Sequence, residues 1–183
     1  DPSLATELIQ LVRRARIELS QHPERDLKLG PGGIREAEFF VQALQLVWGG
    51  RDPSLRTRST LLALAKLESK GLCTQREASD INDAYLALRR AEHAVQTATG
   101  VQTHDLPTGE ALLRLAKTLG FPTTDAFSAA LAGHRRRVER RFLSLSPAGE
   151  APDSTWASLL AALEWRDAAA VIEALQCAAT PDR

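Results

Sequence analysis

The strongest constraint on how this chain folds is a glycine-rich turn, Gly30-Pro31-Gly32-Gly33, that leads directly into a segment with two apolar sides. On a helical wheel of about 100° per residue, a broad arc of the segment 34–48 is apolar. This arc comprises Ile34, Ala37, Phe40, Val41, Leu44, Val47 and Trp48. Phe39 and Leu46 lie on the other side of the wheel. The pattern predicts a helix that is buried on two flanks.

A narrow polar stripe runs between the two apolar flanks of this predicted helix. Its members are Arg35, Glu38, Gln42 and Gln45. Because buried polar groups without partners cost free energy, we expect each of these side chains to have a specific partner.

Helical periodicity recurs along the rest of the chain, and no pair of strands with a hairpin signal is present. The pattern predicts further helices over about 3–21, 57–69, 74–99, 108–119, 124–145, 154–164 and 167–179. Leu and Ala dominate while aromatic residues make up only 5%, which favours helices over sheets. The predicted fold is therefore all-α, a bundle of about six to eight helices.

A turn-rich stretch over 146–153 divides the chain. We expect residues 1–145 to form one helical bundle domain. We expect residues 146–183 to be a linker with short C-terminal helices, which belong either to the same domain or to a connector.

Charge and hydropathy argue against nucleic-acid and membrane partners. The chain has 23 basic and 23 acidic residues, whereas proteins that neutralise phosphates usually have a basic surplus. The arginine-rich run 134–141 shares its segment with an apolar stripe that includes Val138 and Phe142. This pattern predicts that the arginines lie on the solvated face of a helix, and a contact with an acidic partner stays open as an alternative. No apolar run approaches the roughly 18 residues that span a bilayer.

Candidate metal ligands and nucleophiles lack the spacing that such sites need. The four histidines show no metal-ligand spacing with Cys73 or Cys177, so we expect no metal site. The two cysteines form no CxxC motif and are typical of buried free thiols in a reducing cytoplasm, where we place the protein. Asp80 and Asp83, three residues apart on a predicted helix, are expected to face solvent.

The glycine turn has features of an anion site. Gly32 and Gly33 lack side chains where the backbone N–H groups of a helix N-terminus point outward, a common geometry for holding an anion. Lys28 and Arg35 place two positive charges around this turn. In the alternative interpretation, which composition alone favours, the glycines only form a tight turn and Arg35 pairs with Glu36 or Glu38.

A long motif covers the turn and the helix after it. Residues 26–42 read DLKLGPGGIREAEFFVQ and resemble the K-x-G-x-G-G-I-R-E-x-E-F-x-V-Q signature of glutamine synthetase adenylyltransferases. Segments 49–55, 84–96 and 102–107 are also similar to this family. The similarity is thinner to about residue 145, and no motif supports it beyond 146. Ala37 stands where a larger aliphatic residue is expected, which affects packing rather than chemistry.

The resemblance implies a nucleotidyltransferase context. In this family each polypeptide has two similar halves, and each half is a nucleotidyltransferase domain followed by a helical domain. One half adds AMP to a tyrosine of glutamine synthetase, and the other removes it by phosphorolysis. The form Gly-Pro-Gly-Gly-Ile-Arg-Glu is more similar to the N-terminal, adenylyl-removing half. The metal-binding aspartates expected after a Gly-Ser turn are missing from the sequence, so we expect them upstream and the chain alone to be inactive.

The resemblance also implies roles for particular residues, with residues 1–145 closing one wall of the nucleotide site. Lys28 and Arg35 are expected to contact phosphate or nucleotide, and Gly32 and Gly33 to supply backbone N–H groups. A second set is expected behind these groups or at the domain interface: Glu36, Glu38, Gln42, Arg89, Glu92 and Gln96. Within this set, the glutamates 36 and 38 would orient Arg35 or bond to the neighbouring domain. Arg89, Glu92 and Gln96, on the predicted helix 74–99, are interpreted first as partners of the polar stripe. A contact with the ligand is the second interpretation.

The implied cofactors and partners belong to the parent enzyme. Mg²⁺ and ATP or ADP are implied for it, with none bound by this chain alone. The implied partners are the upstream nucleotidyltransferase domain and glutamine synthetase, with a PII-type signalling protein as a further candidate. Two other classes stay open: a protein-interaction module that docks a nitrogen-signalling protein or glutamine synthetase without nucleotide contact, and a freestanding helical protein with no nucleotide role.

Overall fold

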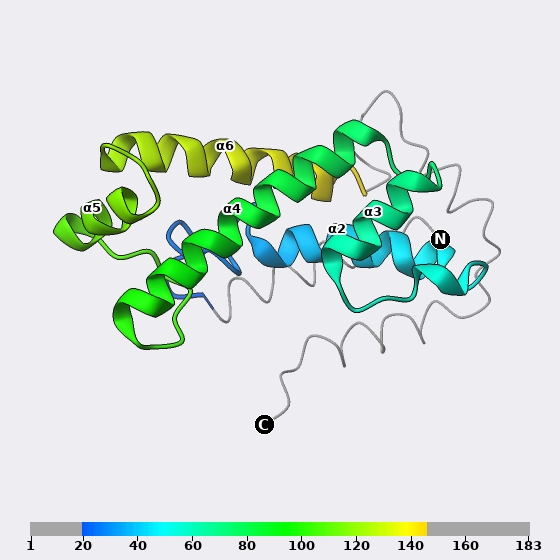
Figure 1. Cartoon of the computed structure of the whole chain (residues 1–183), viewed down its shortest axis with the longest axis horizontal. Helices are drawn as coiled ribbons and strands as arrows, with labels where there is room; N and C mark the ends of the chain where they lie inside the picture. Colours follow the sequence, from blue (N-terminus) through cyan, green and yellow to red (C-terminus); the bar gives the residue numbers. More distant parts are fainter. Residues whose placement is uncertain (1–19, 146–183) are drawn as a thin grey trace.

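The computed structural model describes residues 20–145, which form five α-helices and one 3-10 turn with no strand in this range (Figure 1). The elements are α2 (Ile34–Trp48), η1 (Pro53–Leu55), α3 (Thr60–Ser69), α4 (Gln75–Thr99), α5 (Gly109–Thr118) and α6 (Thr124–Leu143). The predicted all-α class is confirmed. The count of six to eight helices exceeds the five in the described range. The helices predicted over 3–21, 154–164 and 167–179 lie outside it, together with the division at 146 and Cys177.

Helix α4 is the centre of the bundle and packs against each of the other four α-helices. It crosses the view diagonally in Figure 1, with α6 alongside it and α5 near its C-terminal end. Helix α2 packs against α3, α4 and α6, so its two apolar flanks are covered from different directions. The predicted burial on two flanks is confirmed at Phe40, which is 1% exposed, and at Phe39, which is 6% exposed.

Local sequence signals determine where α4 begins and ends. The Thr74 hydroxyl accepts the Glu77 N–H, and the Glu77 carboxylate accepts the Thr74 N–H at 2.8 Å, so the capping box is formed. Gly100 ends the helix in the left-handed conformation, with φ of 66°. Between these ends one apolar stripe is buried in the common core: Ala78, Ile81, Ala84, Leu88, Ala91 and Val95.

A non-helical loop over residues 20–33 leads into α2 and is organised around the carboxylate of Asp26. This side chain is 4% exposed and accepts hydrogen bonds of 2.8 Å from the Ser20 hydroxyl and from the N–H groups of Lys28 and Leu29. The loop also pairs with the segment after α4 through an isolated antiparallel bridge between Asp26 and Asp105. A buried carboxylate with three donors is well satisfied, so the loop has a defined conformation.

The arginine-rich run on α6, expected to be a solvated face, is solvated only in part: Arg136 and Arg140 are exposed, whereas other arginines of the run bond to other segments. The guanidinium of Arg141 donates to Asp80 from Nε at 3.0 Å and from Nη2 at 2.7 Å, which holds α6 against α4. The guanidinium of Arg135 donates to the backbone carbonyls of Glu24 and Asp26. Asp80 was expected to face solvent and is instead mostly buried by this pairing. Asp83 is exposed, as expected.

We expect a methyl group at Gly32 to destabilise the fold. Gly32 has φ of 63°, and a Cβ there would lie 2.1 Å from the carbonyl oxygen of Arg135. The strained backbone and the overlap together predict that Gly32→Ala lowers the free energy of unfolding by about 2–5 kcal/mol. Urea unfolding followed by circular dichroism measures this change.

Gly50→Ala is the matched control, because a Cβ at Gly50 meets nothing within 4 Å. We expect this variant to stay within about 0.5 kcal/mol of the parent. Equal unfolding midpoints for the two variants would contradict the close approach of the turn to α6.

Candidate functional site

Four successive backbone N–H groups at the start of α2, those of residues 32–35, are engaged within the protein. Gly32 N–H donates to Oε2 of Glu36 at 2.9 Å, and Gly33 N–H donates to the Gly30 carbonyl at 2.9 Å. The next two N–H groups donate to the loop, from Ile34 to the Leu27 carbonyl and from Arg35 to the Lys28 carbonyl. The N-terminus of α2 is therefore closed by acceptors of the chain itself.

This closure changes the role expected for the two glycines. Gly32 and Gly33 are buried, and the carboxylate of Glu36 occupies the place that an anion would take. Neither glycine N–H is left to bind a phosphate unless an internal hydrogen bond breaks. The glycines instead allow the turn to approach the backbone of Arg135 closely.

The two cationic side chains singled out in the sequence remain near the surface. Lys28 and Arg35 are each partly exposed, and the hydrogen bond from Arg35 N–H to the Lys28 carbonyl, 3.1 Å long, makes them neighbours. The Arg35 guanidinium lies 5.8 Å from the centre of the Phe39 ring, a distance suited to a cation–π contact. Positive charge is therefore gathered at the entrance to α2.

Two members of the polar stripe of α2, Gln45 and Glu38, form hydrogen bonds with other parts of the bundle. Gln45 donates from Nε2 to the carbonyls of Leu55 and Thr57, at 2.7 and 3.0 Å. Glu38 accepts a hydrogen bond of 3.3 Å from the Tyr85 hydroxyl. Gln42 is exposed, so the expected burial of the stripe is wrong at this position, and its expected place at a domain interface stays a prediction.

Tyr85 is a residue of the site that sequence reasoning missed. Burial raises the pKa of its hydroxyl, and the charge of Glu38 raises it further, so the group stays protonated and donates. Its place in the sequence could have indicated this role, because Tyr85 lies one turn before Arg89 on the same face of α4.

Two further residues of α4, Glu92 and Gln96, bond to the segment after the helix, and Arg89 bonds to Glu92. Glu92 is 4% exposed and accepts from the Arg89 guanidinium on one oxygen, and its other oxygen lies 3.2 Å from Nδ1 of His104. Gln96 donates to the Thr103 carbonyl over 3.4 Å. The first expectation, that these residues partner the stripe, is corrected: Arg89 pairs within α4, and the loop after Gly100 takes the contacts of Glu92 and Gln96. Their place behind the site or at a domain interface stays a prediction.

Together with Lys28 and Arg35, several of these residues form a group that we call the polar face. His104 completes it, because its carbonyl accepts the Leu27 N–H at 2.8 Å and so brings the loop next to α4. The members of the polar face are Lys28, Arg35, Glu38, Tyr85, Arg89, Glu92 and His104. Its cations are partly or fully exposed while the carboxylate of Glu92 is buried, so the face is suited to bind an anionic group.

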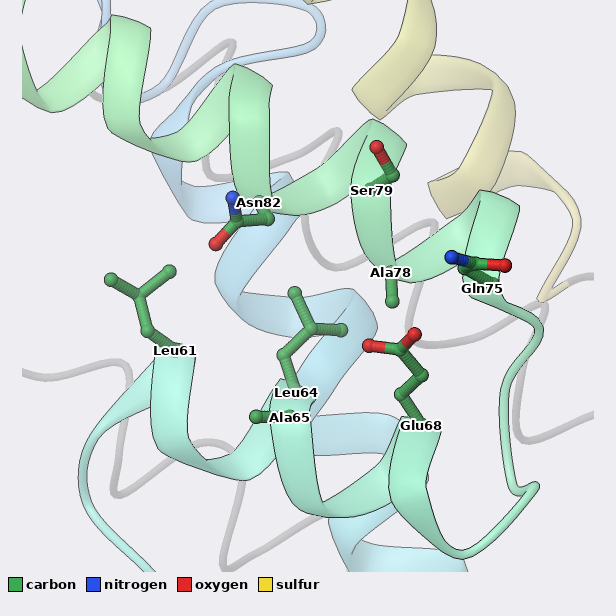
Figure 2. Close-up of a pocket in the computed structure, with 8 residues that line it drawn as sticks. All are labelled: Leu61, Leu64, Ala65, Glu68, Gln75, Ala78, Ser79 and Asn82. Atoms are coloured by element: carbon green, nitrogen blue, oxygen red, sulfur yellow. The ribbon is translucent and has the colours of Figure 1, made fainter.

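A groove of about 250 Å³ lies elsewhere, between α3 and the first two turns of α4. Figure 2 shows Leu61, Leu64 and Glu68 of α3 directed toward α4. Its remaining lining residues are Ala65, Gln75, Ala78, Ser79 and Asn82. With one carboxylate and no basic side chain, this groove is unsuited to a phosphate.

The part of the chain that the structure describes offers no metal centre, since it contains no group of three His, Cys, Asp or Glu side chains arranged to hold an ion. None of the helices within residues 20–145 is long and apolar enough to cross a membrane. Cys73 is a free thiol and is only half-buried rather than fully buried. Burial, followed by the charges of Glu77 and Glu68, raises the pKa of this thiol to about 12.

Comparison with known proteins places the polar face within a matched region. A family model described as GlnD PII-uridylyltransferase matches residues 6–145. A bifunctional glutamine synthetase adenylyltransferase/adenylyl-removing enzyme of Aromatoleum aromaticum is 40% identical over 154 residues, which are 81% of this chain and 16% of that protein. The enzyme of the same description from Rhizobium meliloti is 47% identical over 121 residues, 66% of this chain and 12% of that protein. The chain thus spans less than a fifth of the length of these relatives, and the resemblance seen in residues 26–42 is confirmed.

We expect Cys73 to react slowly with alkylating reagents, because its raised pKa leaves little thiolate at pH 8. In a Cys177→Ser variant, the rate of iodoacetamide labelling in native buffer should be on the order of 100-fold below that of free cysteine. The same variant in denaturant provides the control and should label at the ordinary rate. Fast labelling of the native protein would instead make Cys73 a candidate nucleophile.

Proposed function

We propose a function on the premise that the chain belongs to the GlnD PII-uridylyltransferase family and, within it, to the glutamine synthetase adenylyltransferase/adenylyl-removing enzymes. In this proposal the chain is a helical accessory domain that closes the nucleotide site of a neighbouring nucleotidyltransferase domain. It supports AMP transfer to glutamine synthetase or its phosphorolytic removal. The form of the glycine turn favours the adenylyl-removing half.

The observation that carries the proposal is the gathering of exposed cations on a fixed polar face. The carboxylate of Asp26 and the hydrogen bonds to α2 hold the backbone of Lys28 and Arg35 in place. Held cations bind phosphoryl oxygens with less loss of entropy than flexible ones. We therefore assign the phosphate contacts to the side chains of Lys28 and Arg35, and a shaping role to Gly32 and Gly33.

The chemistry itself is assigned to the neighbouring domain. Mg²⁺ bound there would neutralise phosphate charge and align the reacting groups. Within residues 20–145, no group of three His, Cys, Asp or Glu side chains is arranged to hold such an ion. The contribution of this chain is to bind and orient the phosphoryl group, and Glu36, Glu38 and Tyr85 fix the elements that carry the cations.

A protein-docking module is the second candidate function. Its support is the groove between α3 and α4, together with two exposed leucines on the same two helices, Leu62 at 48% and Leu86 at 43% exposure. In this alternative, glutamine synthetase or a PII-type signalling protein would bind the chain without any nucleotide contact at the polar face.

We expect Lys28→Ala and Arg35→Ala to impair AMP release from adenylylated glutamine synthetase when introduced into the full-length parent enzyme. Loss of one charge-assisted hydrogen bond to phosphate corresponds to about 1.5–3 kcal/mol, so the rate constant kcat/KM should fall about 10- to 100-fold. Release of AMP is measured at varied phosphate concentration, and circular dichroism confirms folding.

Lys117→Ala and Arg136→Ala are the matched controls, because both residues are exposed and lie outside the polar face. We expect these variants to retain kcat/KM within about twofold, as for surface substitutions in general. Unchanged release by Lys28→Ala and Arg35→Ala would count against nucleotide-site closure. A loss caused by Leu62→Asp together with Leu86→Asp would then favour the docking module.

A further inference from the structure

We infer that Arg89 is a further phosphate-binding side chain of the polar face, and that Glu92 and His104 are the residues that position it. The inference rests on the proposed function, because it concerns the same site. It adds a binding residue on α4 to those on the loop and on α2.

The geometry of Glu92 is the first argument. Its carboxylate is almost fully buried, and its two oxygens are divided between two partners, the guanidinium of Arg89 and Nδ1 of His104. Burying a carboxylate is costly, and an apolar residue at this position would extend the buried stripe formed by Leu88, Ala91 and Val95. The ion pair therefore adds little to the stability of α4, but it fixes the direction of the Arg89 guanidinium.

The exposure of Arg89 is the second argument. Half of its side-chain surface is exposed, whereas that of Glu92 is 5% exposed. A guanidinium carries five N–H donors, and the bond to Glu92 uses donors of Nη1 only. The pair thus keeps its negative partner inside the bundle and presents a planar, oriented set of donors outward, which matches the oxygens of a phosphoryl group.

The position of Arg89 is the third argument. Tyr85 precedes it by one helical turn and donates to Glu38, which follows Arg35 by three residues on α2. On the other side, the carbonyl of His104 accepts the N–H of Leu27, the neighbour of Lys28. These two contacts join α4 to α2 and to the loop, the three segments, distant in the sequence, that carry Arg89, Arg35 and Lys28.

Arg90 provides the matched control for this assignment. It is exposed like Arg89 but points about 100° away around α4, and no ion pair with a described residue is recorded for it. In the full-length parent enzyme, AMP release from adenylylated glutamine synthetase is measured with inorganic phosphate as the varied reactant. We expect Arg89→Ala to raise the KM for phosphate about 10- to 100-fold, the loss of one charge-assisted hydrogen bond, and Arg90→Ala to leave it within about twofold.

Glu92→Gln tests positioning separately from binding. We expect it to raise the KM for phosphate by a smaller factor than Arg89→Ala, with kcat less affected, because the guanidinium is present but no longer held. His104→Gln should act in the same direction. A purely structural role for Glu92 would instead lower the melting temperature and leave the KM for phosphate unchanged. Should Glu92→Gln fail to fold, the comparison of Arg89→Ala with Arg90→Ala still tests whether Arg89 binds phosphate, since both residues are exposed.

The outcomes separate this inference from the proposed function. If Lys28→Ala and Arg35→Ala impair release while Arg89→Ala behaves like Arg90→Ala, the assignment of Arg89 is overturned and the proposed function stands. If none of these variants changes the KM or kcat, both are overturned. A raised KM in Arg89→Ala and in at least one of the variants at 28 and 35 supports both.

Discussion

The close approach of the glycine turn to α6 is the contact on which the rest of the structure depends. Gly32 lies against the backbone of Arg135, and the side chain of the same arginine bonds to the carbonyls of Glu24 and Asp26. One residue of α6 therefore holds the loop that precedes α2 at two places, near its middle and at its end. Because this loop also pairs with the segment after α4, its position fixes the relation between three parts of the chain that are far apart in sequence.

The polar face follows from that arrangement. Helix α4 contributes Tyr85 and Arg89, α2 contributes Arg35, and the loop contributes Lys28. None of these elements alone gathers enough charge to hold a phosphoryl group, and it is the packing of α2 against α4 that brings them together. The buried glutamates then act as internal counterions, Glu36 at the turn and Glu92 beneath Arg89, so that the remaining positive charge lies at the surface.

Most of the fold within residues 20–145 could be predicted from the sequence, because helix ends carry local signals such as Thr74 with Glu77 and Gly100. The site was harder to predict. Lys28 and Arg35 were recognised from a motif, but the closure of the α2 N-terminus depends on a loop that has no periodicity. Likewise, the pairing of Arg141 with Asp80 and of Tyr85 with Glu38 joins residues about 60 and 47 positions apart, which no local pattern reveals.

The engaged N–H groups at the start of α2 have a consequence for the way this surface responds to its medium. An anion bound by buried backbone N–H groups is shielded from dissolved ions. An anion bound by exposed Lys and Arg side chains is not shielded, because dissolved salt screens these charges with a Debye length of about 10 Å at 0.1 M. Under the proposed function, anion binding at the polar face would therefore depend on ionic strength and be strongest at low salt. The helix that carries the motif, neutralised by its own glutamate, keeps its structure whether or not an anion is present.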